Sequence, residues 1–140
     1  MNNDLLTHIN WLAVLVAAIA YFILGAIWFS KMLFAKKWVQ YHQINMQDPN
    51  VSKGMGRMMF GSFILMAVIT IGIALLVERL QLSGWMSGAK WGLLTGVCFS
   101  FTAISITYLY TKKPFSLHLI DGMYHVVGQV IVAIILCEWQ

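Results

Sequence analysis

Four long stretches of the chain are almost continuously apolar, and polar or charged residues collect between them. The stretches cover approximately residues 10–30, 58–77, 89–110 and 115–137. Each approaches or exceeds the roughly 20 residues that an α-helix needs to cross a hydrocarbon core of about 30 Å. The pattern predicts an all-α membrane protein in which residues 1–140 form one domain, a bundle of four transmembrane helices.

The fourth stretch combines this apolar length with polar side chains. At about 100° per residue, four polar residues fall within one arc of roughly 80°. We call them the polar stripe: His118, Asp121, His125 and Gln129. The opposite arc is apolar and suits lipid: Leu119, Met123, Val126, Val127, Val130 and Ile134. An ionisable residue at membrane depth costs at least about 2.5–3.5 kcal/mol on insertion scales, so it normally faces protein or water. We therefore expect the rest of the chain to cover the polar stripe.

The connection after the first stretch contains an amphipathic segment, Met32–Ile44. Its aromatic side chains share one side of a helix and its polar side chains another: Phe34, Trp38 and Tyr41 against Lys36, Gln40 and Gln43. Such a segment is typical of a helix that lies on the membrane surface. We expect Lys36 and Lys37 to meet anionic lipid headgroups there. A turn-rich connector, residues 47–56, follows it.

The third stretch carries small residues at four-residue spacing, which allows two helix backbones to approach closely. They are Gly92, Gly96, Ser100, Ala103 and Thr107, and Gly25 plays a similar part in the first stretch. The facing helix belongs either to the same chain or to a second copy, and we expect a homo-oligomer. The hydroxyls of Thr95, Thr102 and Ser105 are expected to bond back to their own helix, with a hydroxyl-lined pathway as the alternative. Residues 81–90 are expected to form a loop broken at Gly84 and Gly88.

Charge indicates topology rather than a nucleic-acid partner. Charged residues make up 10% of the chain, against about 25% in soluble proteins. Of the nine Lys and Arg residues, five lie in the connection after the first stretch and two in the one after the third, which makes seven. Only Arg79 and Lys90 lie on the other side. The positive-inside rule then places both basic connections in the cytoplasm and both termini outside.

Asp121 and His125 are the candidate chemical centre. A carboxylate and an imidazole at positions i and i+4 share one helix face and are able to hydrogen bond, and such a pair titrates as a unit. Further residues at matching depth are candidates to complete the network: Tyr124, Gln129, Thr107 or Tyr108, Tyr21 and Trp28.

Three interpretations of the polar stripe compete. It is a packing network that fixes helix register, or a relay for protons or a small solute, or a metal or haem site. His118 and His125 are seven residues apart, about 10.5 Å along a helix, so they cannot chelate one metal by themselves. We predict no metal and no cofactor. No phosphate-binding glycine loop, Ser-His-Asp arrangement or HExxH motif is present, so no enzyme is predicted either.

Two segments resemble a bacterial membrane family catalogued as domain of unknown function 1761. They are Asn10–Phe34 and Leu119–Leu136. The matching positions are Asn10, Trp11, Gly25, Trp28, Ser30, Leu33, Phe34, Trp38, Asp121 and Tyr124. The chain departs from the family pattern at Phe29, Lys31 and Ala35, where Tyr, Pro and Gly are expected. The resemblance implies a four-helix protein of the bacterial inner membrane, and it groups Trp28, Ser30, Asp121 and Tyr124 in one site.

The sequence therefore predicts a multi-pass membrane protein with one of two roles. In the first, it is a small transporter or channel that moves protons or a small solute along the polar stripe. In the alternative, it is a non-catalytic structural or accessory protein in which the stripe holds helices together.

Overall fold

The computed structural model describes residues 6–139, and every regular element in that range is helical. In chain order these are α1 (Trp11–Trp28), α2 (Ala35–Tyr41), α3 (Met55–Arg79), α4 (Trp85–Thr95), the π-helical turn η2 (Gly96–Phe101), α5 (Thr102–Tyr110) and α6 (Phe115–Glu138). Elements α4, η2 and α5 follow one another without a break. The described residues thus contain four helices long and apolar enough to cross a membrane, over residues 11–28, 55–79, 85–110 and 115–138. The predicted all-α, four-span architecture is confirmed.

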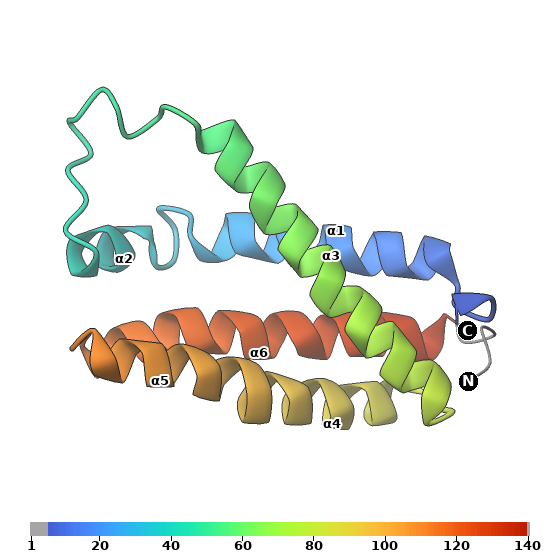
Figure 1. Cartoon of the computed structure of the whole chain (residues 1–140). Coiled ribbons are helices and arrows are strands. Elements are labelled where there is room, and N and C mark those ends of the chain that lie inside the picture. Colours follow the sequence, from blue (N-terminus) through green and yellow to red (C-terminus); the bar gives the residue numbers. More distant parts are fainter. Residues whose placement is uncertain (1–5, 140) are drawn as a thin grey trace.

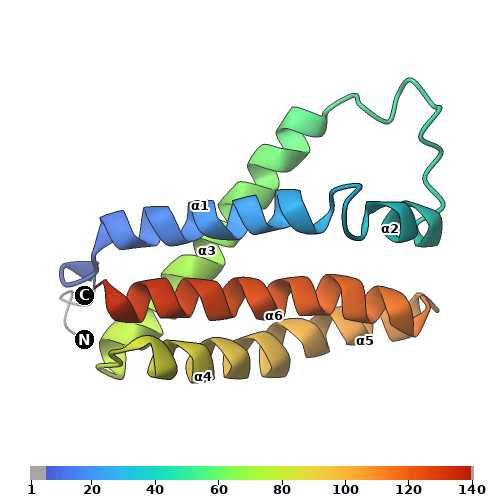
Figure 2. The same cartoon turned by 180° about the vertical axis from the view of Figure 1, so that it is seen from behind.

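Helix α6 lies at the centre of the bundle. In Figures 1 and 2, α1 runs along one side of α6, the α4–α5 rod runs along the other, and α3 crosses obliquely over α1 and α6. In the most apolar window of α6, 56% of the residues are buried, against 17–28% in the other three spans. The arc opposite the polar stripe, which its apolar composition predicts to face lipid, is therefore covered in part by protein. Leu119 and Met123 are exposed, but Val126 is buried against the α4–α5 rod.

Glycines allow the α4–α5 rod to approach α6 within backbone contact. A Cβ atom placed on Gly92 would lie 2.5 Å from Cα of Val130, and Gly88 and Gly96 lie similarly close to α6. The facing helix predicted for the small-residue stripe is therefore in the same chain. The sequence predicts a helix break at Gly88, but Gly88 lies inside α4, where this contact with α6 buries it. The break comes at Gly84, which has a φ of 80° and directly precedes Trp85, the first residue of α4.

The segment after α1 forms a shorter helix than Met32–Ile44. Helix α2 contains seven residues, and it ends where Gln43 adopts a φ of 55°. Its aromatic side packs against the end of α1, with ring centroids of Phe29 and Trp38 5.7 Å apart. Lys36 and Lys37 are exposed. Helix α2 also contacts α6, so it covers one end of the bundle.

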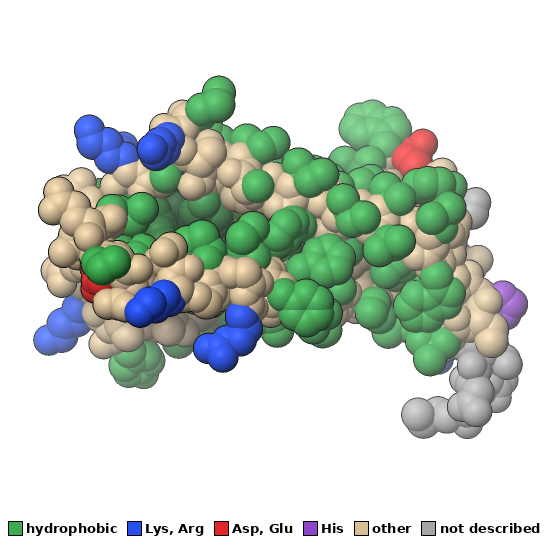
Figure 3. Space-filling view, turned by 90° about the horizontal axis from the view of Figure 1, so that it is seen from above, with side chains coloured by type: hydrophobic (Ala, Val, Ile, Leu, Met, Phe, Trp, Pro, Cys, Tyr) green, Lys and Arg blue, Asp and Glu red, His purple; other side chains and the backbone are tan. Residues whose placement is uncertain are grey.

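The two basic connections lie at the same end of the bundle. Residues 29–54 and 111–114 both reach the end where α2 sits, and Figure 3 shows Lys and Arg side chains gathered toward that end. At the opposite end, Nδ2 of Asn10 donates a hydrogen bond to the carbonyl of Trp139 at 3.1 Å. Asn10 also caps α1 by accepting from the backbone N–H of Ala13. The start of the first span and the end of the last are therefore joined.

Candidate functional site

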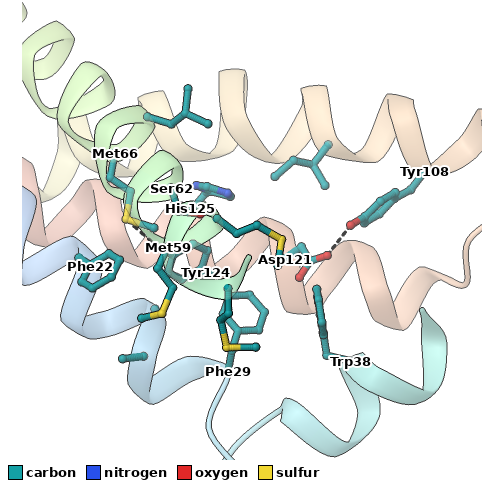
Figure 4. Close-up of a pocket in the computed structure, with 16 residues that line it drawn as sticks. Phe22, Phe29, Trp38, Met59, Ser62, Met66, Tyr108, Asp121, Tyr124 and His125 are labelled. Carbon is teal, nitrogen blue, oxygen red and sulfur yellow. Dashed lines mark hydrogen bonds between the residues drawn. The ribbon is translucent and has the colours of Figure 1, made fainter. Parts of the chain in front are cut away.

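A cavity of about 530 Å³ lies between α1, α2, α3, α5 and α6, toward the α2 end of the bundle. Figure 4 shows its side chains pointing in from all five helices. Most of the lining is apolar or aromatic, and α3 contributes four methionines. The residues are Phe22, Gly25, Ala26, Phe29, Trp38, Met55, Met58, Met59, Ser62, Leu65, Met66, Ile104, Tyr108, Asp121, Tyr124 and His125. Two polar-stripe residues thus line one cavity.

Asp121 sits in this cavity with only one carboxylate oxygen hydrogen bonded. Its relative exposure is 9%. The Tyr108 hydroxyl on α5 donates to Oδ2, and Nε2 of His42 lies 3.9 Å from the same oxygen. Oδ1 has no hydrogen-bond partner among the described residues, and the Trp38 ring lies beside the carboxylate in Figure 4. Burying a carboxylate oxygen without a partner carries a large desolvation cost, so this position is prepared for a further donor or a positive charge.

His125 lines the same cavity one turn further along α6. Its Nδ1 forms a hydrogen bond with the hydroxyl of Tyr21 on α1, whose side chain is fully buried. The Tyr21 ring lies against Gly128, where an added Cβ would come within 2.1 Å of Cε2. Asp121 and His125 therefore pair with tyrosines from different helices rather than with each other, which corrects the pairing expected from their i, i+4 spacing.

The other two members of the polar stripe do not line the cavity. His118 is buried, and its Nε2 lies within hydrogen-bond distance, 3.3 Å, of the Lys113 carbonyl. Gln129 is also buried and donates from Nε2 to Oγ of Ser100. Both side chains are thus held by neighbours in the α4–α6 half of the protein. The stripe is divided into two cavity-lining residues and two packed residues.

Trp28 and Tyr124 support the cavity, with Gly25 making room for Tyr124. Trp28 Nε1 donates to the carbonyl of Ile120 at 2.9 Å, which ties the end of α1 to α6 directly before Asp121. The Tyr124 hydroxyl lies 3.5 Å from Sδ of Met66. A Cβ on Gly25 would lie 2.9 Å from that hydroxyl, so only glycine leaves space for it.

Two other predicted supporting residues lie outside the site. Ser30 forms part of the turn after α1, where its hydroxyl accepts from the backbone N–H of Met32. Thr107 is exposed and donates to the carbonyl of Ala103, one turn back in its own helix. Of the two alternatives, Thr107 and Tyr108, the structure thus brings only Tyr108 to Asp121.

Most hydroxyls of the third span serve their own helix. Thr95 donates to the Trp91 carbonyl, and Thr102 donates to the Cys98 carbonyl at 2.7 Å. This confirms the expected back-bonding for both threonines. Ser105 Oγ has no hydrogen-bond partner among the described residues. These side chains do not form a hydroxyl-lined path.

Sequence reasoning missed His42 and Trp38 as members of the site. Helix α2 was expected on the membrane surface, with no reason to point toward Asp121. A signal was present, because His42 lies one turn after Trp38 and so continues the aromatic side of that helix. The methionines of α3 were also missed as cavity residues. Positions 55, 58, 59 and 66 share one side of a helix, but this pattern is visible only weakly in a span that is apolar all round.

A second, smaller cavity opens at the opposite end of the bundle, at the junction of α1, α3 and α6. It has a volume of about 270 Å³ and is lined by residues of α1, α3, α6 and the adjoining chain ends, with Glu78 and His8 among them. Between the two cavities lies a tightly packed layer. Tyr21, Thr70 and Val132 in that layer are fully buried. The cavities are therefore separated by side chains rather than joined by an open path.

No group of three or more His, Cys, Asp or Glu side chains within residues 6–139 is arranged to hold a metal ion.

A family model described as a protein of unknown function, DUF1761, matches residues 12–137 of the chain. The family that the sequence resembles is thereby confirmed. No curated protein and no solved structure matches the chain.

Proposed function

The chain belongs to the DUF1761 family, whose function is unknown, and from that premise we propose that it is a small membrane transporter. It binds a small solute in the 530 Å³ cavity and exchanges it against protons carried by Asp121 and His125. The observation that supports this most directly is the unpartnered Oδ1 of Asp121 in a largely apolar cavity. Intramembrane ionisable residues that line a cavity are typical of substrate and proton pathways.

The arrangement of the two cavities favours a carrier over an open channel. One cavity opens toward each end of the α1–α3–α6 junction, and the buried layer that contains Tyr21 separates them. A carrier exposes its site to one side at a time by moving helices against each other. Helix α3 suits such a motion, because it crosses α1 and α6 obliquely (Figure 1). The Tyr21–His125 hydrogen bond lies where the larger cavity meets this layer.

The alternative is a structural or accessory membrane protein. The specific observation in its favour is that His118 and Gln129, half of the polar stripe, are buried and paired with neighbouring groups. In that role Asp121 and Tyr108 act in the same way, as interhelical glue. Under either role the protein is not an enzyme.

We also propose the setting in which transport takes place. The protein lies in the bacterial inner membrane as a homo-oligomer, with both termini outside and the α2 end in the cytoplasm. Lys36 and Lys37, both exposed on α2, meet anionic headgroups on that side. The larger cavity then faces the cytoplasm and the smaller one the opposite side.

Cysteine accessibility tests the transport proposal. Single cysteines at positions 118, 121, 125 and 129, in a background without Cys98 and Cys137, are probed with a membrane-impermeant maleimide in right-side-out and inverted vesicles. We expect labelling at 121 and 125, which line the cavity, and protection at 118 and 129, which are packed. Protection at all four positions in a normally folded protein would support the structural role and end the transport proposal.

A further inference from the structure

Among the described residues that line the larger cavity, Asp121 is the one acidic side chain. None of the other lining residues that the structure describes is Asp, Glu, Lys or Arg. The carboxylate is nine-tenths buried, and one of its oxygens lacks a partner. A buried carboxylate is stabilised most by a positive charge brought close to it. The cavity therefore has the electrostatics of a cation site.

Four aromatic residues line the same cavity as this carboxylate. They are Phe29, which follows α1, Trp38 from α2, Tyr108 from α5 and Tyr124 from α6. Aromatic faces attract organic cations through their quadrupole, with Trp the strongest. Strongly hydrated inorganic ions gain less from such a lining, because they would lose water without enough oxygen ligands. The lining thus favours a cation whose charge is carried on an organic body.

The remaining walls fit a bulky apolar body. The volume of about 530 Å³ falls within the range of pockets that hold drug-sized molecules. The α3 wall contains four methionines in addition to Ser62 and Leu65: Met55, Met58, Met59 and Met66. Unbranched, polarizable methionine side chains adapt to apolar groups of different shape. The α3 wall is therefore able to accept varied apolar substituents.

We propose that the substrate class is lipophilic organic cations, held with the positive group at Asp121 and the apolar body against the α3 methionines. This inference rests on the proposed transport function and names its substrate. His42 lies beside this position, with its Nε2 3.9 Å from Asp121 Oδ2.

Three probes of similar shape and different charge test this class. Binding of tetraphenylphosphonium, neutral triphenylphosphine oxide and anionic tetraphenylborate is measured by equilibrium dialysis on the full chain in nanodiscs of zwitterionic lipid. We expect saturable binding of the phosphonium, with the oxide and the borate bound at least about tenfold more weakly, since only the cation pairs with the carboxylate. Equal binding of the cation and the neutral oxide would overturn the inference.

Asp121→Asn should weaken phosphonium binding by at least about tenfold, while Glu78→Gln, at the other cavity, leaves it unchanged. Undiminished binding to a folded Asp121→Asn protein would overturn the inference.

If Asp121→Asn does not fold, Ser62→Trp provides the test. Ser62 lies on the exposed side of α3 and lines the cavity, so a tryptophan there fills the cavity. Ile64→Trp is the matched control, because Ile64 is exposed on the same helix but is outside the lining. Phosphonium binding to Ser62→Trp at the Ile64→Trp level would likewise overturn it.

These outcomes are separable from failure of the transport proposal. If no probe binds but positions 121 and 125 are labelled by maleimide, the cation class is wrong and the accessible cavity stands. If neither position is labelled, the transport proposal fails, and any phosphonium bound then belongs to a non-transporting protein.

Discussion

The phenol of Tyr21 on α1 hydrogen bonds to Nδ1 of His125 on α6, across 104 positions of sequence. The pair lies at the boundary between the larger cavity and the packed layer beneath it. Tyr21 itself is fully buried, and Gly128 provides the space for its ring. This bond connects the first span directly to the central one at the depth where the two cavities are closed off from each other.

Tyr21→Phe is expected to loosen this boundary without unfolding the protein. It leaves a buried imidazole nitrogen without its partner, which costs about 1–3 kcal/mol. We expect lower thermal stability in detergent and increased maleimide labelling of a cysteine placed at position 129, below the boundary. Tyr110→Phe is the matched control, because Tyr110 is 87% exposed. Unchanged stability and labelling would show that the Tyr21 hydroxyl does not close the layer.

Glycines of α4 should be irreplaceable where they touch α6. Gly92→Ala places a Cβ 2.5 Å from Cα of Val130, a backbone contact that has no side chain to move aside. We expect a loss of about 1–3 kcal/mol, typical of overpacking, measured by unfolding in a mixed-micelle denaturant titration.

Gly72→Ala is the control for this substitution. Gly72 lies inside α3, and nothing is within 4 Å of a Cβ built there. Alanine should therefore be neutral or stabilising by up to about 0.5–1 kcal/mol, since it restricts the unfolded chain. Equal destabilisation by both substitutions would mean that α4 and α6 are not packed as closely as described.

Replacing Lys36 and Lys37 together by Gln should weaken binding to anionic lipid. Basic residues near a negatively charged surface contribute about 1 kcal/mol each. We expect less phosphatidylglycerol to co-purify with the double variant, quantified by mass spectrometry of bound lipid. Lys112→Gln with Lys113→Gln is the comparison, as these lysines occupy the other connection at the same end. Equal lipid loss in both double variants would remove the special role of α2.

Phosphonium binding should weaken as the pH falls, because a proton on the Asp121 carboxylate removes the negative charge that pairs with the cation. The other titratable side chains around the carboxylate are His42 after α2, Tyr108 on α5 and His125 on α6, whereas α1 and α3 contribute no charged side chain to the lining.

The measurement is phosphonium binding between about pH 5 and pH 8, the range in which proteins are generally most stable. We expect a several-fold weakening toward acid pH in the natural chain and a flat, weak curve in Asp121→Asn. Glu78→Gln is the control, because Glu78 lines the smaller cavity instead. An equal pH dependence in the natural chain and in Asp121→Asn would show that protonation of Asp121 does not weaken cation binding.

Some of the polar stripe was predictable and some was not. Periodicity alone places the stripe on one face of one helix. The cost of exposing charge to lipid predicts that other helices cover the stripe. Which residues open into a cavity does not follow from periodicity. Gln129 is covered because Ser100 meets it from η2, whereas Asp121 borders a cavity because the start of α3 lies away from it. Those contacts depend on how helices distant in sequence cross.

The sequence by itself determined the four spans, the short helix after the first span and the location of both basic connections at one end. These features depend on the length of each apolar segment and on the charge of each connection, which can be read from that segment alone. The tertiary structure decided the rest. In the tertiary structure, glycine contacts with α4 make α6 the central helix, His42 and Trp38 lie beside Asp121, and Tyr21 hydrogen bonds to His125. Each of these contacts depends on close packing between segments that are distant in sequence, and the sequence of one segment does not indicate which other segment it contacts.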